Sequence, residues 1–91
     1  MDIRHPLTPM DWRMIEWSLS MNLHVHILLT KADKLKRGAA SQALLSTQKM
    51  LGQEASQPDK VTIQLFSATT REGVEEVHRQ LNSWLLNAAD L

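Results

Sequence analysis

The sequence predicts an α/β fold built on a parallel sheet, and two patterns support this prediction. Helical and extended segments alternate along the 91 residues in the order helix, strand, helix, strand, helix, which is typical of parallel sheets with right-handed crossovers. The two expected strands are short, β-branched and apolar with little alternation, as in strands buried on both faces. Because ligands bind such sheets outside the carboxyl ends of the strands, the residues after each strand are candidates for a site.

The first expected helix covers residues 9–21. Thr8 can act as its N-cap, Pro9 suits the first helical position, Asp11 favours the positive end of the helix dipole, and Asn22 would close the helix. Apolar residues at helical spacing are more often core than a partner surface. Those of this helix are Met10, Trp12, Met14, Ile15, Trp17, Leu19 and Met21. If part of a larger sheet lies outside the chain, some of them would be exposed.

The remaining elements follow from the same patterns. We expect strands at residues 24–30 and 61–67, a helix at 38–55, a turn at 57–60 and a last helix at 71–89. The last helix has the clearest apolar stripe in the chain. It consists of Val74, Val77, Leu81, Trp84, Leu85 and Ala88.

Composition limits the function classes. The chain has no cysteine, so it can hold neither a disulfide nor a thiolate metal site. His24 and His26 stand two residues apart, but no third metal ligand is evident nearby, so we expect no metal site. No apolar run is long enough to span a bilayer and no signal-peptide pattern opens the chain, which predicts a cytoplasmic protein. No catalytic side-chain arrangement is recognisable.

The overall charge of zero conceals an asymmetry. Residues 1–50 carry seven Lys/Arg and four Asp/Glu, a net +3, whereas residues 51–91 carry three Lys/Arg and six Asp/Glu, a net −3. The basic excess lies largely at Lys31, Lys34, Lys36 and Arg37. These residues could face an anionic partner, although a solvated helix start explains each of them singly.

The run Thr30-Lys31-Ala32-Asp33 follows the first expected strand and resembles the guanine-reading [N/T]-K-x-D motif of regulatory GTPases. A carboxylate such as that of Asp33 can accept two parallel hydrogen bonds from guanine N1–H and N2–H₂, a pair that adenine cannot donate. The apolar stem of Lys31 can lie across a flat base while its ammonium stays in water. The alternative for Asp33 is a cap on the following helix.

Three segments together resemble the EngB (YihA/YsxC) family of bacterial P-loop GTPases. They are residues 2–7 (D-I-R-H-P-L), residues 30–35 (T-K-A-D-K-L), and Phe66-Ser67-Ala68 followed by Gly73. The resemblance implies a partial Ras-like P-loop GTPase fold, with residues 1–91 as the C-terminal portion of one GTPase domain and its N-terminal half missing.

The resemblance also implies roles for individual residues. Those expected to bind guanine are Thr30, Lys31, Asp33, Ser67 and Ala68, with Lys34 and Thr69 as possible flanking residues. Ala68 would act through its backbone N–H on guanine O6, and Ser67 would shape that loop. Without the family match, a plain strand-to-helix turn explains Ser67 and Ala68 nearly as well.

The full-length family protein is expected to bind GTP or GDP with Mg²⁺, to take part in assembly of the large ribosomal subunit, and to affect cell division and septation. However, this sequence contains neither a G-x-x-x-x-G-K-[ST] phosphate loop nor a D-x-x-G magnesium motif. We therefore expect no GTP hydrolysis by this chain alone.

Two alternatives to a GTPase portion remain open. The chain could be a non-enzymatic ribosome- or protein-binding module, or an inert folded fragment. In either case an unpaired sheet edge would favour self-association.

Overall fold

The computed structural model describes the backbone of residues 1–89 and the side chains of residues 1–85. Its helices and strands have the predicted order and type. They are α1 (Pro9–Ser20), β1 (Val25–Leu29), α2 (Arg37–Glu54), β2 (Val61–Leu65) and α3 (Val74–Ala89), with two short 3₁₀ helices, η1 (Ala32–Lys34) and η2 (Pro58–Lys60). Helix η2 lies within the turn predicted at residues 57–60, whereas η1 was not predicted, because it is a single turn without an apolar period.

The strands β1 and β2 form a parallel pair, in register from Val25 beside Val61 to Leu29 beside Leu65. The first three residues lie along the other edge of β1. There the Ile3 N–H donates to the Thr30 carbonyl at 3.0 Å, and the Thr30 N–H donates to the Met1 carbonyl at 2.7 Å. The N-terminal segment thus extends the sheet by one short parallel pairing, which lies beside the carboxyl end of β1.

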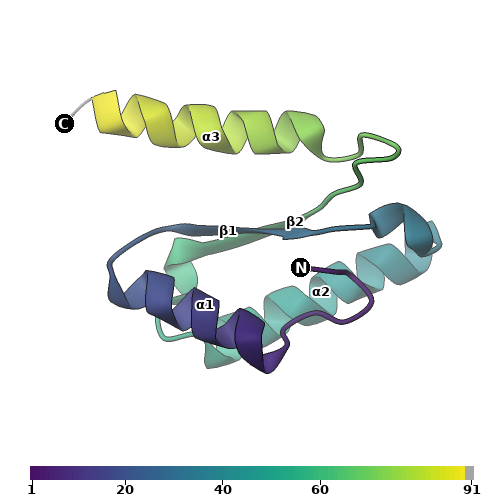
Figure 1. Ribbon diagram of the computed structural model, residues 1–91, viewed down its shortest axis with the longest axis horizontal. Coiled ribbons are helices and arrows are strands. Elements are labelled where there is room, and N and C mark those ends of the chain that lie inside the picture. Colours follow the sequence, from purple (N-terminus) through teal and green to yellow (C-terminus); the bar gives the residue numbers. More distant parts are fainter. Residues whose placement is uncertain (90–91) are drawn as a thin grey trace.

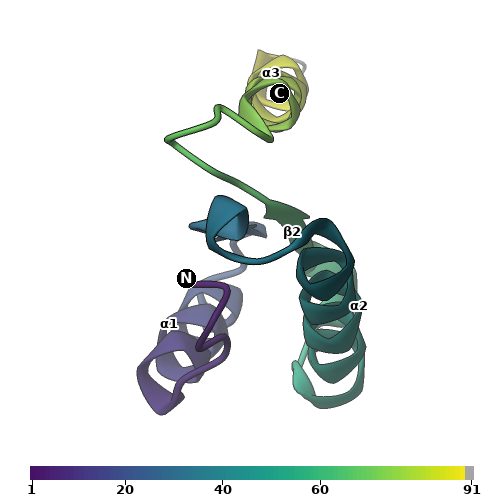
Figure 2. The same cartoon turned by 90° about the vertical axis from the view of Figure 1, so that its right-hand side faces the viewer.

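The helices form layers on both faces of the sheet. Helices α1 and α2 cover one face, and α3 runs across the opposite face (Figures 1 and 2). The buried core lies between the sheet and the α1–α2 layer, in two clusters. One contains Ile3, Leu29, Ala32 and Ala40, and the other contains Ile15, Leu19, Ile27 and Leu51.

The ends of α1 follow from its sequence. Thr8 caps the helix through its hydroxyl, which accepts from the Asp11 N–H at 3.2 Å, while the Asp11 carboxylate accepts from the Thr8 N–H at 3.0 Å. Pro9 occupies the first turn as predicted. The helix ends before Asn22, which adopts a left-handed φ of 61°, a conformation that asparagine tolerates better than most residues.

The prediction that the α1 stripe is core is wrong for four of its residues. Met10, Met14, Trp17 and Met21 are between 56% and 68% exposed. Only Ile15 and Leu19 are buried, because they lie on the side of α1 that packs against the sheet. No described element covers the side that bears the four exposed residues.

The start of α3 and the ends of the strands also differ from prediction. Helix α3 begins at Val74 rather than at residue 71, since Arg71 and Gly73 have φ values of 63° and 85°, which a right-handed helix excludes. The strands are shorter than the predicted 24–30 and 61–67, because the chain turns into η1 and into the loop before α3. The side chain of Ala88 lies outside the described side chains.

Neither a cluster of metal ligands nor a membrane-spanning helix is found among the described residues. No group of three or more His, Cys, Asp or Glu side chains is placed to hold a metal ion there, so His24 and His26 gain no third ligand. Among the helices of the same part of the chain, none combines the length and apolar character needed to cross a bilayer.

Candidate functional site

The two predicted motifs meet at the carboxyl ends of the paired strands. Residues 30–33 follow β1, and Ser67 is the second residue after β2. Backbone pairing continues past both strands, since the Phe66 N–H donates to the Leu29 carbonyl at 2.9 Å and the Ala32 N–H donates to the Phe66 carbonyl at 3.1 Å. These two hydrogen bonds fix one loop against the other.

Asp33 and Ser67 are joined directly. The Ser67 hydroxyl donates to the Asp33 Oδ1 at 2.7 Å, and the same hydroxyl oxygen accepts from the Thr70 N–H at 3.2 Å. Ser67 is fully buried. A hydroxyl has a single proton, and a carboxylate can only accept, so the Ser67 proton points to Asp33. The hydrogen bond from Ser67 is the main cause that lowers the pKa of Asp33. The site therefore holds an ionised carboxylate, and its second oxygen takes no side-chain hydrogen bond from the described residues.

Lys31 lies beside the N-terminal segment. Its backbone has a left-handed φ of 60° immediately before η1, and its Nζ lies 3.6 Å from the Asp2 Oδ2. Asp2 is itself held by Arg4, whose Nη2 donates to Asp2 Oδ2 at 3.0 Å. The hydrogen bond from Arg4 is the main reason that the pKa of Asp2 lies well below its usual range. The Lys31 ammonium is thus drawn toward a fixed carboxylate at one side of the site.

The Thr30 hydroxyl bonds to the N-terminal segment and not to the loop that carries Ser67. It donates to the Met1 carbonyl at 3.0 Å. The side-chain link between the two loops is made by Asp33 and Ser67, whereas Thr30 ties β1 to the N-terminal segment. The sequence motif places Thr30 at the end of β1 but does not identify this partner.

Ala68 and Thr69 are exposed at the tip of the second loop. The Ala68 N–H has no hydrogen-bond partner among the described residues. On either side of it, the Ser67 N–H donates to the Glu72 carbonyl at 3.0 Å and the Thr70 N–H is held by the Ser67 hydroxyl. Ala68 is therefore an exposed residue with an N–H that is unpaired among the described residues, on a loop shaped by hydrogen bonds of its neighbours.

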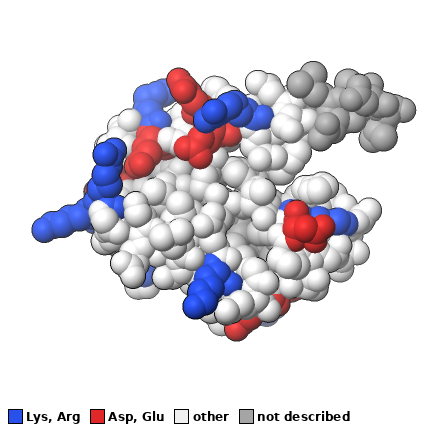
Figure 3. All heavy atoms as spheres, turned by 180° about the vertical axis from the view of Figure 1, so that it is seen from behind, with Lys and Arg blue, Asp and Glu red and all other residues white. Residues whose placement is uncertain are grey.

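A hollow of about 460 Å³ adjoins Asp33. It is lined by Ala32, Asp33, Leu35, Arg37, Ala40, Ser41, Leu65, Thr70 and Glu72. The lining includes Thr70 and Glu72, which the sequence motifs did not identify, since neither belongs to a recognisable pattern. Lys31 and Lys34 are exposed nearby, and Lys and Arg side chains project at the end of the molecule where the strands end (Figure 3).

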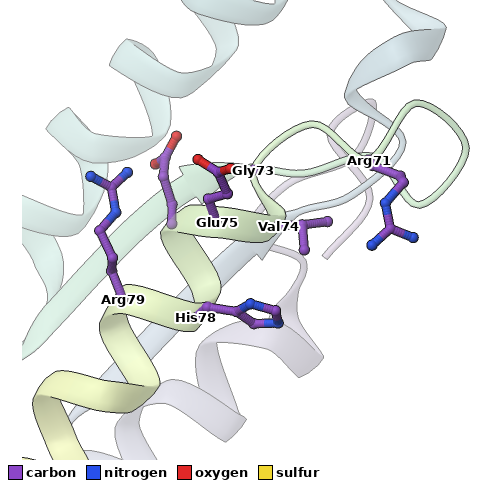
Figure 4. Close-up of a pocket in the computed structure, with 7 residues that line it drawn as sticks. Arg71, Gly73, Val74, Glu75, His78 and Arg79 are labelled. Atoms are coloured by element: carbon purple, nitrogen blue, oxygen red, sulfur yellow. The ribbon is translucent and has the colours of Figure 1, made fainter.

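A second hollow, of about 520 Å³, lies at the start of α3 (Figure 4). Its lining carries charges of both signs, from Arg71, Arg79, Glu75 and Glu76, and also includes His78. None of the residues predicted to bind guanine lines it. We therefore place the candidate site at Asp33 and not at this hollow.

Comparison with known proteins identifies the relationship. The chain is 45% identical over 89 residues to "Probable GTP-binding protein EngB" of Azoarcus sp. (strain BH72). Over nearly its whole length the chain is therefore similar to part of an EngB protein. The match covers 98% of this chain but only 42% of that EngB protein. No protein-family model matches the chain.

The similarity to an EngB protein agrees with the fold. The parallel sheet with helices on both faces is compatible with part of a P-loop GTPase fold. The name of that relative describes it as a probable GTP-binding protein. Because this chain spans less than half of the EngB relative, the activity of a whole EngB protein does not pass directly to it.

Proposed function

We propose that this chain is the guanine-recognising portion of a GTP-binding protein, corresponding to the C-terminal part of a single GTPase domain. The observation that carries the proposal is the 2.7 Å hydrogen bond from Ser67 to Asp33, which joins the loops after two adjacent parallel strands. It presents an ionised carboxylate at the edge of the sheet where such folds bind ligands. Guanine N1–H and N2–H₂ match that carboxylate, whereas adenine offers no such pair of donors.

Each remaining residue has a proposed role in binding the base. The stem of Lys31 lies along the ring while its ammonium stays near Asp2. The exposed Ala68 N–H donates to guanine O6. Lys34 and Thr69 flank the base, and Thr30 supports the loop from β1.

The phosphates and Mg²⁺ would be bound elsewhere in a full-length protein. This sequence contains no G-x-x-x-x-G-K-[ST] or D-x-x-G run, and these runs supply the backbone cradle, the lysine and the metal contacts of phosphoryl transfer. We propose that the chain selects the base and does not itself hydrolyse GTP. The Mg²⁺ that accompanies GTP or GDP would be held by residues outside it.

The cellular role is proposed from the resemblance to EngB proteins. The full-length protein would act in the cytoplasm in assembly of the large ribosomal subunit, with effects on cell division and septation. The basic residues at the end of the strands, including Lys34 and Lys36, are suitable for contact with ribosomal RNA.

A nucleotide titration tests base recognition without a phosphate loop. We expect GMP at millimolar concentration to shift the backbone amide NMR signals of Asp33 and Ala68, while AMP at the same concentration leaves them unchanged. GMP and AMP each carry one phosphate and one ribose, so a difference between the shifts that they cause reports recognition of the base. Equal shifts with GMP and AMP, or no shift with GMP, would contradict the proposal.

A second candidate function is a non-enzymatic protein-binding module. The observation that favours it is the exposed apolar side of α1, with Met10, Met14, Trp17 and Met21. An exposed apolar patch of this kind marks an interaction surface or a source of self-association. A chain that binds no guanine nucleotide yet captures a partner through α1 would favour this candidate.

A further inference from the structure

One buried side chain, Gln64, closes the base of the loop between β2 and α3. Its Nε2 donates to the Leu65 carbonyl at 3.1 Å and to the Gly73 carbonyl at 2.8 Å. Leu65 is the last residue of β2, and Gly73 directly precedes α3. One amide group therefore holds the point where the loop leaves the sheet to the point where it returns.

The oxygen of this amide contacts His26 of β1. The His26 Nε2 lies 2.7 Å from the Gln64 Oε1, and the His26 Nδ1 lies 2.6 Å from the Thr62 Oγ1. Because the Gln64 NH₂ group faces two carbonyls, its Oε1 must accept, so we assign the His26 proton to Nε2. A reversed amide would place its oxygen against the Leu65 and Gly73 carbonyls, which is unfavourable.

Gly73 is suited to this close approach. It has a φ of 85°, and a Cβ at this position would stand 2.6 Å from the Gln64 Nε2 and would clash with the Leu65 carbonyl. Only glycine allows the chain to return so near to β2. The hydrogen bond from Gln64 to the residue 73 carbonyl therefore depends on glycine at that position.

The fixed end of the loop is connected to the candidate site by one further hydrogen bond. The residue before Gly73 is Glu72, whose carbonyl accepts from the Ser67 N–H at 3.0 Å. Ser67 in turn donates to Asp33 at 2.7 Å. A continuous path thus runs from Gln64 through the loop end to the carboxylate.

We propose that Gln64 is a positioning residue for the candidate base site. By holding Gly73 to the end of β2, it fixes Ser67 and the exposed Ala68 N–H relative to Asp33. The inference rests on the proposed function for its relevance to guanine. Its geometric content needs no nucleotide, so it can be tested separately.

The variant Gln64→Met tests the proposal, because methionine has a similar length but cannot donate to the two carbonyls. We expect the pKa of Asp33, followed by NMR of its side-chain carboxyl carbon during a pH titration, to rise toward the usual aspartate value as the Ser67 hydrogen bond weakens. The control is Ile15→Val, which removes a buried methyl(ene) group from the core cluster of Ile15, Leu19, Ile27 and Leu51 and should leave the pKa of Asp33 unchanged. An Asp33 pKa in folded Gln64→Met equal to that of the parent chain would overturn the proposal.

A measurement on the unaltered chain removes any dependence on how well the variant folds. The side-chain NH₂ protons of Gln64 should exchange with D₂O slowly, on the time scale of the Ser67 backbone N–H, because both are bonded within the same loop. The exposed Gln48 serves as the internal reference for fast exchange. Exchange of the Gln64 protons as fast as those of Gln48 would overturn the proposal.

The two proposals fail in different ways. If the parent chain shows no preference for GMP over AMP while the Asp33 pKa responds to Gln64→Met, base recognition is wrong and the positioning role of Gln64 stands. If GMP binds selectively and the pKa does not respond, the positioning role is wrong and base recognition stands.

Discussion

At the scale of single residues, the candidate site depends on one hydroxyl. Ser67 is fully buried, accepts from Thr70 and donates to Asp33. Its neighbour Ala68 is exposed and has an N–H without a partner among the described residues. The same short segment therefore supplies a buried group that orients the carboxylate and an exposed group that can donate to a ligand.

Replacing Ser67 by alanine should raise the pKa of Asp33 toward the usual aspartate value. The hydrogen bond from Ser67 is the largest cause of the lowered pKa, and alanine cannot donate. A lowered folded-state pKa stabilises the protein above the unfolded-state pKa, and this contribution disappears as the pH falls through the folded-state value. Ser67→Ala should therefore lose less stability between neutral and acidic pH than the parent chain.

A carboxyl NMR titration, together with denaturant unfolding at several pH values, measures both effects. The matched control is Ser46→Ala, an exposed serine on α2, which should change neither quantity. An unchanged Asp33 pKa in Ser67→Ala would show that the hydrogen bond does not control the carboxylate.

At the scale of elements, the sequence allowed prediction of the helices and strands but not of the loop before α3. Strong signals identified α1, such as Thr8 and Pro9 at its start, and Asn22 at its end. The start of α3 was misplaced because its apolar period says nothing about the left-handed φ of Arg71. Such a conformation in a non-glycine residue is set by hydrogen bonds across the loop, which have no local sequence signature.

The candidate site was likewise predicted only in part. The motif placed Asp33 and Ser67 at the ends of neighbouring strands, and the structure brings them together. The role of Thr30 was less predictable, because its partner Met1 is remote in sequence and pairs with β1 only through tertiary structure. Gln64 was not predicted to support the site, since nothing in a β2 sequence indicates which loop carbonyls a strand side chain will reach.

Two glycine substitutions should change the stability of the chain in opposite directions. Gly73→Ala should destabilise the chain by about 1–3 kcal/mol, because its φ of 85° is unfavourable for alanine and a Cβ would clash with the Leu65 carbonyl. Gly38→Ala lies in the first turn of α2, where an added Cβ would meet no atom within 4 Å. This second substitution should stabilise the chain by roughly 0.4–1 kcal/mol.

Urea unfolding of the two glycine variants beside the parent chain tests this contrast. The same change of residue is made at both positions, so a difference reports the local backbone and its neighbours. Equal unfolding midpoints for the two variants would contradict the close approach of Gly73 to β2.

At the scale of the whole molecule, the inner side of the α1–α2 layer is buried against the sheet, whereas the outer side of α1 is exposed. The α1–α2 side contains both buried clusters, yet the outer side of α1 exposes Met14 and Trp17. Among the described residues, the short segment 1–3 alone pairs with the edge of β1 that faces away from β2. Exposed apolar groups and an incompletely paired strand edge both favour association.

We therefore predict that the isolated chain self-associates with increasing concentration. The combined change Met14→Gln and Trp17→Gln should reduce this association, because it removes apolar area from the exposed side of α1 and leaves the buried Ile15 and Leu19 in place. Sedimentation velocity over a range of concentrations measures the effect. A parent chain that stays monomeric throughout would contradict this prediction.

The most direct test of guanine recognition by Asp33 is the base preference of Asp33→Asn. The asparagine amide can donate to the C2 carbonyl of xanthine but can no longer accept both guanine donors. We predict that the parent chain prefers GMP to XMP, and that Asp33→Asn reverses this preference, as measured by NMR titration, with Asp59→Asn as a control that keeps it. Retention of the GMP preference by Asp33→Asn would contradict the assignment of Asp33 as the base-reading residue.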